Sequence, residues 1–380
     1  MSLARLRLVF ARLPRFLQPS LPALAAVIVG LWGCVAIHAV TAGGLSSRHF
    51  VARQLVWVVV GLVAFAVARG IPFRTYRRHV LWFAGVPYAA LWLVLLVGIR
   101  INGMRGWFAW RGLFCQPSEL CKPVFVLATT VLLVRFRRRD AEERPGPLLA
   151  GAGGLAWLVP LVLQPDFGAV LVYSMTLAVL YWCLGGRLRH LLAGLGAGLV
   201  GVAVVLWRYP YVRRRFVAFL DPEKYATGSG WHMLQFRRSL AAGGWFGHSW
   251  EMGSWSRAYL PLGHSDSVFA NMAESVGFVG LVPFVVLILA WMVYAHSRAR
   301  KCASPENAGT ILGLGALVAG QGFIHLSVNL GLLPPTGITL PLVSYGGSSL
   351  VATMIAFGML ESAWLDECES RGTDGQPSGT

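Results

Sequence analysis

The chain has 380 residues, of which 56% are apolar and only 13% are charged. A soluble domain carries roughly 25% charged residues, so this composition excludes a soluble protein of two or three domains. The formal net charge of +17 is large enough to suggest a nucleic-acid partner, and the positions of the basic residues decide whether one is needed.

The apolar residues are grouped in blocks about as long as a membrane-crossing helix, which needs roughly 20 residues to cross about 30 Å of hydrocarbon. The predicted fold class is therefore all-α integral membrane. The blocks are Leu21–Val40, Leu55–Ala68, Val80–Gly98, Pro123–Val134, Pro147–Leu163, Gly168–Leu184, Leu191–Trp207, Gly277–His296, Thr310–Leu330 and Leu350–Trp364. The second and the fourth reach full length only with flanking polar residues, so we predict ten crossings, give or take one.

The basic residues are concentrated in alternate loops. If the N-terminus is cytoplasmic, they fall in the inner segments 1–20, 74–78, 135–144, 187–189 and 298–301, whereas the short outer loops hold few. This asymmetry is typical of membrane proteins. We therefore predict a multi-pass protein with both termini in the cytoplasm, whose positive charge sets its topology and contacts anionic lipid, with no nucleic-acid partner.

Three parts are predicted: a basic cytoplasmic arm over residues 1–20, a membrane domain over 21–365 and a disordered cytoplasmic tail over 366–380. The membrane domain has one large outer loop, 208–275, in which two segments mix aromatic, aliphatic and arginine residues at helical spacing. These segments predict amphipathic helices that lie in the membrane interface, pack on the bundle, or do both. The six cysteines show no metal-ligand spacing, and no metal site is predicted.

Carboxylates are rare in this chain, and one at membrane depth is costly, so each is a functional hypothesis. In the motif that starts at Gln116, Ser118 is placed to cap the helix that it precedes. Glu119 and Lys122 are three residues apart, so they share a helix face and neutralise each other. A structural and a functional role both remain open for this pair.

The connection from Gln164 to Gly168 is too short to leave the membrane far. Its proline and glycine break the helix and expose backbone groups, which is tolerated only against protein or a wet cavity. Asp166 would stand at the N-terminus of the next span, where the helix dipole favours a carboxylate. Capping and a functional role are again both open.

His264 and Asp266 lie beside aromatic and apolar residues near the end of the outer loop. Partial desolvation there would raise the pKa of the carboxyl toward the range of a general base. A further segment, 333–349, is rich in proline, glycine and hydroxyl residues. It predicts an extended or re-entrant loop that lines a cavity.

Together these segments resemble the SEDS family of shape, elongation, division and sporulation proteins, which includes RodA, FtsW and SpoVE. The resemblance covers roughly Leu21 to Ser362, and its motifs stand in the family's order. They are N-G-x-R-x-W from Asn102, QPSEL-x-K from Gln116, QPDFG from Gln164, GGWFG from Gly243, LP-x-x-HSD from Leu260 and PPTGITLPLVSYGGSS from Pro334.

The resemblance implies a glycosyltransferase that polymerises lipid II into peptidoglycan strands at the outer face of the cytoplasmic membrane, in cell elongation or division. It implies a class B penicillin-binding transpeptidase as partner, and Asp266 as the base that takes the proton of the acceptor hydroxyl. No cofactor is evident, although a divalent cation is an alternative to arginine as partner of the pyrophosphate. The residues implied for substrate binding are Arg105, Trp107, Glu119, Lys122, Asp166, Arg213, Arg215, His264, Ser344 and Tyr345.

The chain departs from the family pattern near the predicted base. Leu262 stands where the family has glutamate, and loss of that neighbouring carboxylate is expected to lower the pKa of Asp266 somewhat. Gly106 and His325 stand where an arginine and an asparagine are common.

Two other functions remain open from the sequence. A lipid II flippase or transporter is supported by Asp166, Glu119 and Lys122 at membrane depth. The third possibility is a non-catalytic scaffold that recruits a penicillin-binding transpeptidase.

Overall fold

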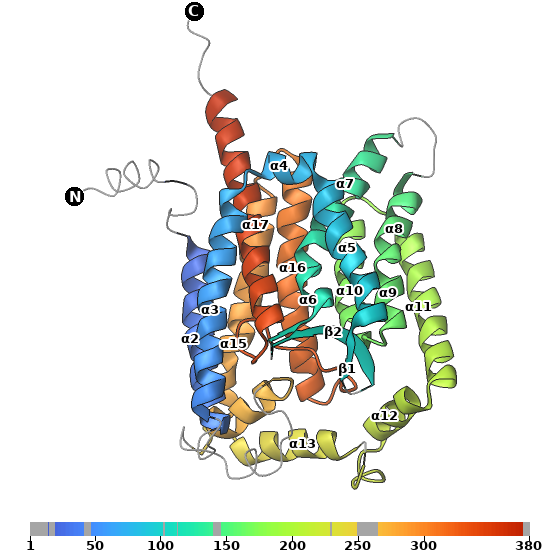
Figure 1. Cartoon of the computed structure of the whole chain (residues 1–380), viewed down its shortest axis with the longest axis vertical. Coiled ribbons are helices and arrows are strands. Elements are labelled where there is room, and N and C mark those ends of the chain that lie inside the picture. The colour runs from blue at the N-terminus through green and yellow to red at the C-terminus, as the bar shows by residue number, and fades with distance from the viewer. Residues whose placement is uncertain are drawn as a thin grey trace, which may run out of the picture.

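The computed structural model describes Pro14 and residues 20–41, 47–101, 103–111, 113–139, 146–228, 230–248 and 265–374 (Figure 1). The helices are α2 (Leu21–Thr41), α3 (Ser47–Gly70), α4 (Phe73–Arg78), α5 (Val80–Val97), α6 (Pro117–Leu120), α7 (Lys122–Arg139), α8 (Gly146–Ala156), α9 (Leu158–Leu163), α10 (Phe167–Cys183), α11 (Leu188–Arg208), α12 (Pro210–Leu220), α13 (Trp231–Gly243), α15 (Val268–Ala299), α16 (Pro305–Asn329) and α17 (Gly347–Asp374). The strands are β1 (Ile99–Ile101), β2 (Met104–Trp110) and β3 (Leu113–Cys115).

The predicted membrane class is confirmed. Each of the ten apolar blocks falls on a helix, and among the described residues seven helices are long and apolar enough to cross a membrane unaided. Of the remaining three blocks, one is α7, which ends in a run of arginines, and the others are the shorter apolar helices α8–α9 and α10. The number of ten crossings therefore stays a prediction.

The all-α prediction did not include one small sheet. Between α5 and α6 the chain forms an antiparallel sheet in the order β1-β2-β3, with Ile99 opposite Trp107 and Phe108 opposite Cys115. The strands are too short to give a clear alternating pattern, but their aromatic residues suit a pleated surface. The sheet lies at the same end of the bundle as α12 and α13 (Figure 1).

The core is centred on α16, which packs against α7, α10, α15 and α17 and is buried over most of its length. Aromatic side chains such as Phe125, Trp157 and Tyr173 fill the space between α7, α9 and α10. By contrast, no residue in the range Leu188–Arg208 is buried, so α11 stands at the edge of the bundle with its apolar side chains outward. An apolar exterior is expected where lipid is the solvent.

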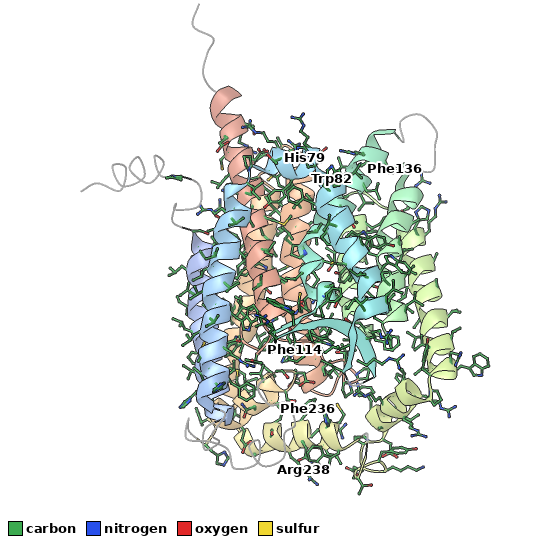
Figure 2. All side chains as sticks on the ribbon, viewed as in Figure 1. His79, Trp82, Phe114, Phe136, Phe236 and Arg238 are labelled. Atoms are coloured by element: carbon green, nitrogen blue, oxygen red, sulfur yellow. The ribbon has the colours of Figure 1, made fainter. Side chains whose placement is uncertain are left out.

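The two amphipathic helices predicted in the outer loop are confirmed as α12 and α13. Helix α13 packs against α15, and it buries Met233 and Phe236 while leaving Arg237 and Arg238 exposed. Figure 2 shows Phe236 directed toward the bundle and Arg238 away from it. Packing on the bundle thus holds for α13, and contact of the arginines with headgroups stays a prediction.

The predicted disordered tail does not begin at residue 366, because α17 continues to Asp374. Glu367 explains the extra turns: its carboxylate accepts hydrogen bonds from the backbone N–H groups of Ala303 and Ser304 and from Nδ2 of Asn307. These contacts tie the end of α17 to the start of α16. The predicted N-terminal arm lies almost wholly outside the described residues, as does the end of the tail from residue 375.

The predicted start of the eighth span at Gly277 coincides with a break inside α15, and the half-helix from Val268 to this break was not predicted. At Gly277 the helix is broken by a positive φ of 65°, a conformation that favours glycine. The segment after α13 fills the break: the N–H of Phe278 donates to Gly244 O at 2.9 Å, and that of Val279 to Trp245 O at 3.0 Å. These bonds cap the half-helix after the break, and the N–H of His248 donates to Glu274 O, at 3.2 Å, in the half-helix before it.

The close approach of α13 to this half-helix makes a testable prediction. A Cβ at Gly243 would lie 2.0 Å from the carbonyl oxygen of Ala273, so Gly243→Ala must push the two helices apart. We expect a loss of about 1–3 kcal/mol in the free energy of unfolding, the usual effect of overpacking. Denaturation in detergent measures it. Gly194→Ala is the matched control, since a Cβ there meets no described atom within 4 Å; equal stability of both variants would contradict the prediction.

Candidate active site

Asp266 lies in a turn, residues 265–267, that leads directly into α15. Ser265 Oγ donates to Asp266 Oδ1 at 3.1 Å. Two other elements hold the backbone of the turn: Asn329 Nδ2, at the end of α16, donates to Asp266 O at 3.0 Å, and Ser344 Oγ donates to Ser265 O at 2.6 Å. The carboxylate is therefore presented by a turn that is bonded to both α16 and the segment 333–346.

The environment of Asp266 favours a proton acceptor. Asp266 is half-buried, and this burial raises the pKa of its carboxyl above the ordinary value. Hydrogen bonds from the backbone and from Ser265, together with the charge of Arg215, act in the opposite direction but are weaker than burial. Leu262, whose missing carboxylate was expected to lower this pKa, lies outside the described residues.

A basic cavity of about 530 Å³ lies among α12, α13 and the loop after α16. It is lined by Arg214, Arg215, Lys224, Tyr225, Thr227, Gly228, His232 and Pro335. Arg215 connects it with the turn, because its charge acts on Asp266 as well as on His232, where burial and Arg215 lower the pKa of the imidazole. Such a cavity is chemically suited to a phosphate-bearing ligand.

A second polar cluster surrounds Asp166, and the predicted capping role is confirmed. Asp166 Oδ1 accepts from the N–H of Ala169 in the first turn of α10, at 3.0 Å. Its Oδ2 accepts from Ser118 Oγ at 2.8 Å and from Gln116 Nε2 at 3.1 Å. The prediction that Ser118 caps its own helix is wrong: α6 starts at Pro117 with Gln116 as N-cap, so Ser118 lies inside the helix and serves the buried carboxylate.

The predicted pairing of Glu119 and Lys122 is also confirmed. Lys122 Nζ is 2.6 Å from Glu119 Oε1 and 2.7 Å from Gln321 Oε1, and Lys122 is only 3% exposed. Gln321 Nε2 in turn donates to Thr339 O at 3.1 Å and lies 3.2 Å from Ser349 Oγ. Lys122 is thus bound inside the protein, and a buried ion pair with this many partners holds α7, α16 and the segment 333–346 together.

The remaining predicted residues are distributed over the same end of the bundle. Arg105 lies on β2, where its Nη1 donates to Leu95 O, near the end of α5, at 3.0 Å, and Trp107 is half-buried on the same strand. Arg213 is exposed on α12, next to the two arginines that line the cavity. Tyr345 meets Phe50 edge-on, with ring centroids 5.2 Å apart.

Ser344 anchors the turn as described above, and His264 lies outside the described residues. Their roles in substrate binding, like those of Arg105, Trp107, Arg213 and Tyr345, stay predictions. Among the residues that the structure describes, no three His, Cys, Asp or Glu side chains lie close enough to hold a metal ion. A divalent cation at the site therefore also stays a prediction.

The sequence did not single out Gln321 and Asn329 as members of the site. A signal for them exists: Gln321, His325 and Asn329 recur every four residues in an otherwise apolar span, so they share one face of α16. Polar groups on one face of a membrane helix point into the protein or a cavity. Lys224 and His232 carry no comparable signal, because they lie on an exposed connection and on α13.

The fold and the site define a multi-pass membrane protein that presents a half-buried carboxylate and a basic cavity at one end of its bundle. The family model for cell cycle proteins of the FtsW, RodA and SpoVE type matches residues 19–367. The chain belongs to this family, as its motifs predicted.

Named relatives agree with this assignment. A protein of Thioalkalivibrio sulfidiphilus named probable peptidoglycan glycosyltransferase FtsW is 35% identical over 336 residues, 85% of this chain and 82% of that protein. A protein of the same name from Nitrosococcus halophilus is 34% identical over 358 residues, covering 90% and 91%.

Solved structures show the same fold. The rod shape determining protein RodA of Thermus thermophilus is similar with a TM-score of 0.69 and 27% identity, over 91% of this chain and 96% of that one. A chain from a structure of a peptidoglycan synthase complex that coordinates polymerization and crosslinking has a TM-score of 0.72 and 28% identity, over 90% and 98%.

Proposed function

We propose that this protein is a peptidoglycan glycosyltransferase that polymerises lipid II at the outer face of the cytoplasmic membrane, with Asp266 as general base. The observation that carries the proposal is the half-buried carboxylate of Asp266, whose raised pKa suits a proton acceptor, within electrostatic reach of Arg215 in a basic cavity. Membership of the FtsW, RodA and SpoVE family and the names of the relatives support it.

In the proposed reaction the hydroxyl of the acceptor sugar attacks the anomeric carbon of the donor. The new glycosidic C–O bond forms as the bond to the lipid pyrophosphate breaks, and the hydroxyl proton passes to the Asp266 carboxylate. The pyrophosphate leaves with the bonding electron pair and is already a good leaving group, so base catalysis and correct positioning supply most of what the reaction needs.

The basic cavity is the proposed site for the pyrophosphate. Arg214 and Arg215 present planar guanidinium groups that bind phosphate oxygens in pairs, and Lys224 adds a compact charge. All three side chains are exposed at the surface of the protein. Their charge also stabilises the negative charge that the leaving group gains during the reaction.

The proposed orientation follows from the distribution of charge along the bundle. Helix α4 carries Arg74, Arg77 and Arg78 and lies at the end where α17 finishes, opposite to the sheet, α12 and α13 (Figure 1). Basic residues favour the cytoplasmic side, which supports an outer location for Asp266 and cytoplasmic termini. The similarity to a chain of a peptidoglycan synthase complex supports a class B penicillin-binding transpeptidase as partner.

Polymerisation of labelled lipid II by the purified protein, together with its cognate transpeptidase, tests the proposal. We expect glycan strands. If the native protein forms none, the enzymatic function is contradicted and the non-catalytic scaffold is favoured. Translocation of lipid II in liposomes tests the transporter: transport lost in Asp166→Ala but kept in Asp266→Ala would favour it. The observed partners of Asp166, a helix N-terminus and two neutral side chains, favour a structural role instead.

The link between Arg215 and Asp266 predicts a change in pH dependence. The charge of Arg215 favours the ionised carboxylate and so lowers its pKa. Arg215→Gln should therefore move the acidic limb of the kcat profile to higher pH, and kcat/KM should fall about tenfold through the lost phosphate contact. Steady-state kinetics over a range of pH measure both. Arg208→Gln, at the exposed end of α11, is the control; an unmoved or downward-shifted limb in Arg215→Gln would contradict the prediction.

A further inference from the structure

We infer that Asn329 is a positioning residue for Asp266: its amide fixes the turn that carries the carboxylate, and His325 fixes the amide. The inference deepens the proposed function and rests on it, since it assigns the residues that hold the proposed base in place. Neither side chain belongs to the predicted substrate-binding set, and both are fully buried on the same face of α16.

The amide of Asn329 bonds the backbone on both sides of the start of α15. Its Nδ2 donates to Asp266 O at 3.0 Å, and its Oδ1 accepts from the N–H of Ala270 at 3.1 Å. The first N–H groups of a helix have no partner within the helix, so Asn329 caps α15 from a different helix. One rigid side chain thereby sets the distance between Asp266 and the N-terminal turn of α15.

Two acceptors of His325, its backbone oxygen and its ring, determine which way the amide of Asn329 faces. His325 Nδ1 lies 2.7 Å from Ile338 O, and because a carbonyl oxygen only accepts, Nδ1 must carry the hydrogen. In the neutral ring Nε2 is then an acceptor, and it lies 3.3 Å from Asn329 Nδ2, which also donates to the backbone oxygen of His325 at 3.0 Å. The NH₂ group of Asn329 is therefore turned toward His325 and Asp266 O, which leaves its oxygen for Ala270.

The same contacts join the turn to the segment 333–346. His325 holds this segment at Ile338, and Ser344 Oγ accepts from the N–H of Leu340 at 2.8 Å while donating to Ser265 O. Two hydrogen bonds therefore hold the turn that carries Asp266: one from Asn329 of α16 and one from Ser344 of the segment. Loss of the Asn329 tie frees one side of the turn, and a displacement of about 1 Å at a reacting group can reduce a rate about 100-fold.

The test uses the full chain with its transpeptidase and labelled lipid II. Asn329→Ala is expected to lower kcat about 10- to 100-fold with the KM for lipid II changed less than about twofold, because the residue acts through Asp266 and touches no substrate. Asn329→Asp keeps the acceptor that caps α15 but loses the donor to Asp266 O, so it should lose kcat as well. Its buried carboxylate has no cation and is expected to lower the thermal unfolding temperature, so the rates are compared at a temperature at which both variants are folded. Ser327→Ala is the control on the same helix, since Ser327 Oγ donates only locally, to Phe323 O at 2.8 Å.

Native kcat in both Asn329 variants, or a loss that appears in KM or equally in Ser327→Ala, would overturn the inference. Adding Asn329→Ala to Asp266→Asn should cause no further loss, whereas a further loss of tenfold or more would show that Asn329 acts independently of the carboxylate. Native kcat in Asp266→Asn alone would instead refute the proposed base. The two failures are therefore distinguishable.

Discussion

Asp266→Asn is expected to lower kcat for the polymerisation of lipid II by about 10²- to 10⁴-fold, the range that a positioned general base contributes. Asparagine has nearly the same shape and keeps an oxygen for the hydrogen bond from Ser265, but it accepts no proton at neutral pH. The substitution therefore removes the proposed chemistry and leaves the turn in place. Steady-state kinetics with the purified protein and its transpeptidase measure the effect.

The pH profile gives a second measurement of the same prediction. Burial raises the pKa of Asp266, so native kcat should fall as the pH drops through a value above that of an ordinary aspartate. The residual rate of Asp266→Asn should lack this acidic limb. Glu223→Gln, which changes an exposed carboxylate between α12 and α13, should keep the native rate and profile. A native kcat in Asp266→Asn, or a loss confined to KM, would rule out the proposed base.

Local patterns predicted the parts of this fold that depend on local physics. The apolar blocks, the amphipathic segments that became α12 and α13, and the capping aspartate Asp166 all follow from residues close together in sequence. The pair Glu119–Lys122 was predictable for the same reason, because three residues of helix bring its two side chains together.

The parts that were missed depend on residues far apart in the chain. Ser118 does not cap its own helix but donates a hydrogen bond to the carboxylate of Asp166, 48 positions away. Asn329 donates to the backbone oxygen of Asp266, 63 positions away. The half-helix before the break at Gly277 was not predicted either, and it packs against α13 and bonds to the segment that follows α13. The spacing of Gln321, His325 and Asn329 marks a polar face of α16, but no pattern shows which distant residues this face contacts. The sequence therefore identified the carboxylate but not the groups that fix its position.

The buried ion pair of Lys122 and Glu119 gives the prediction with the largest effect on stability. Lys122→Met leaves Glu119 as a largely buried carboxylate without its cation and removes the donor to Gln321 Oε1. Breaking a buried ion pair from one side costs about 3–5 kcal/mol, whereas replacing both partners by neutral side chains is often neutral. We therefore expect Lys122→Met to lower the free energy of unfolding by about that amount, and Glu119→Gln/Lys122→Met to recover most of it.

Denaturation in detergent measures these stabilities, and Lys224→Met is the matched control. Lys224 is exposed in the basic cavity, so its loss should leave stability within about 0.5 kcal/mol while lowering polymerisation. The two lysines then separate two roles: one holds α7 to α16 inside the bundle, and the other meets the substrate. If the double variant is no more stable than Lys122→Met, the unpaired carboxylate is not the cause of the loss. If Lys122→Met is as stable as the native protein, Lys122 has no structural role, and the hypothesis that it takes part in transport of lipid II would gain support.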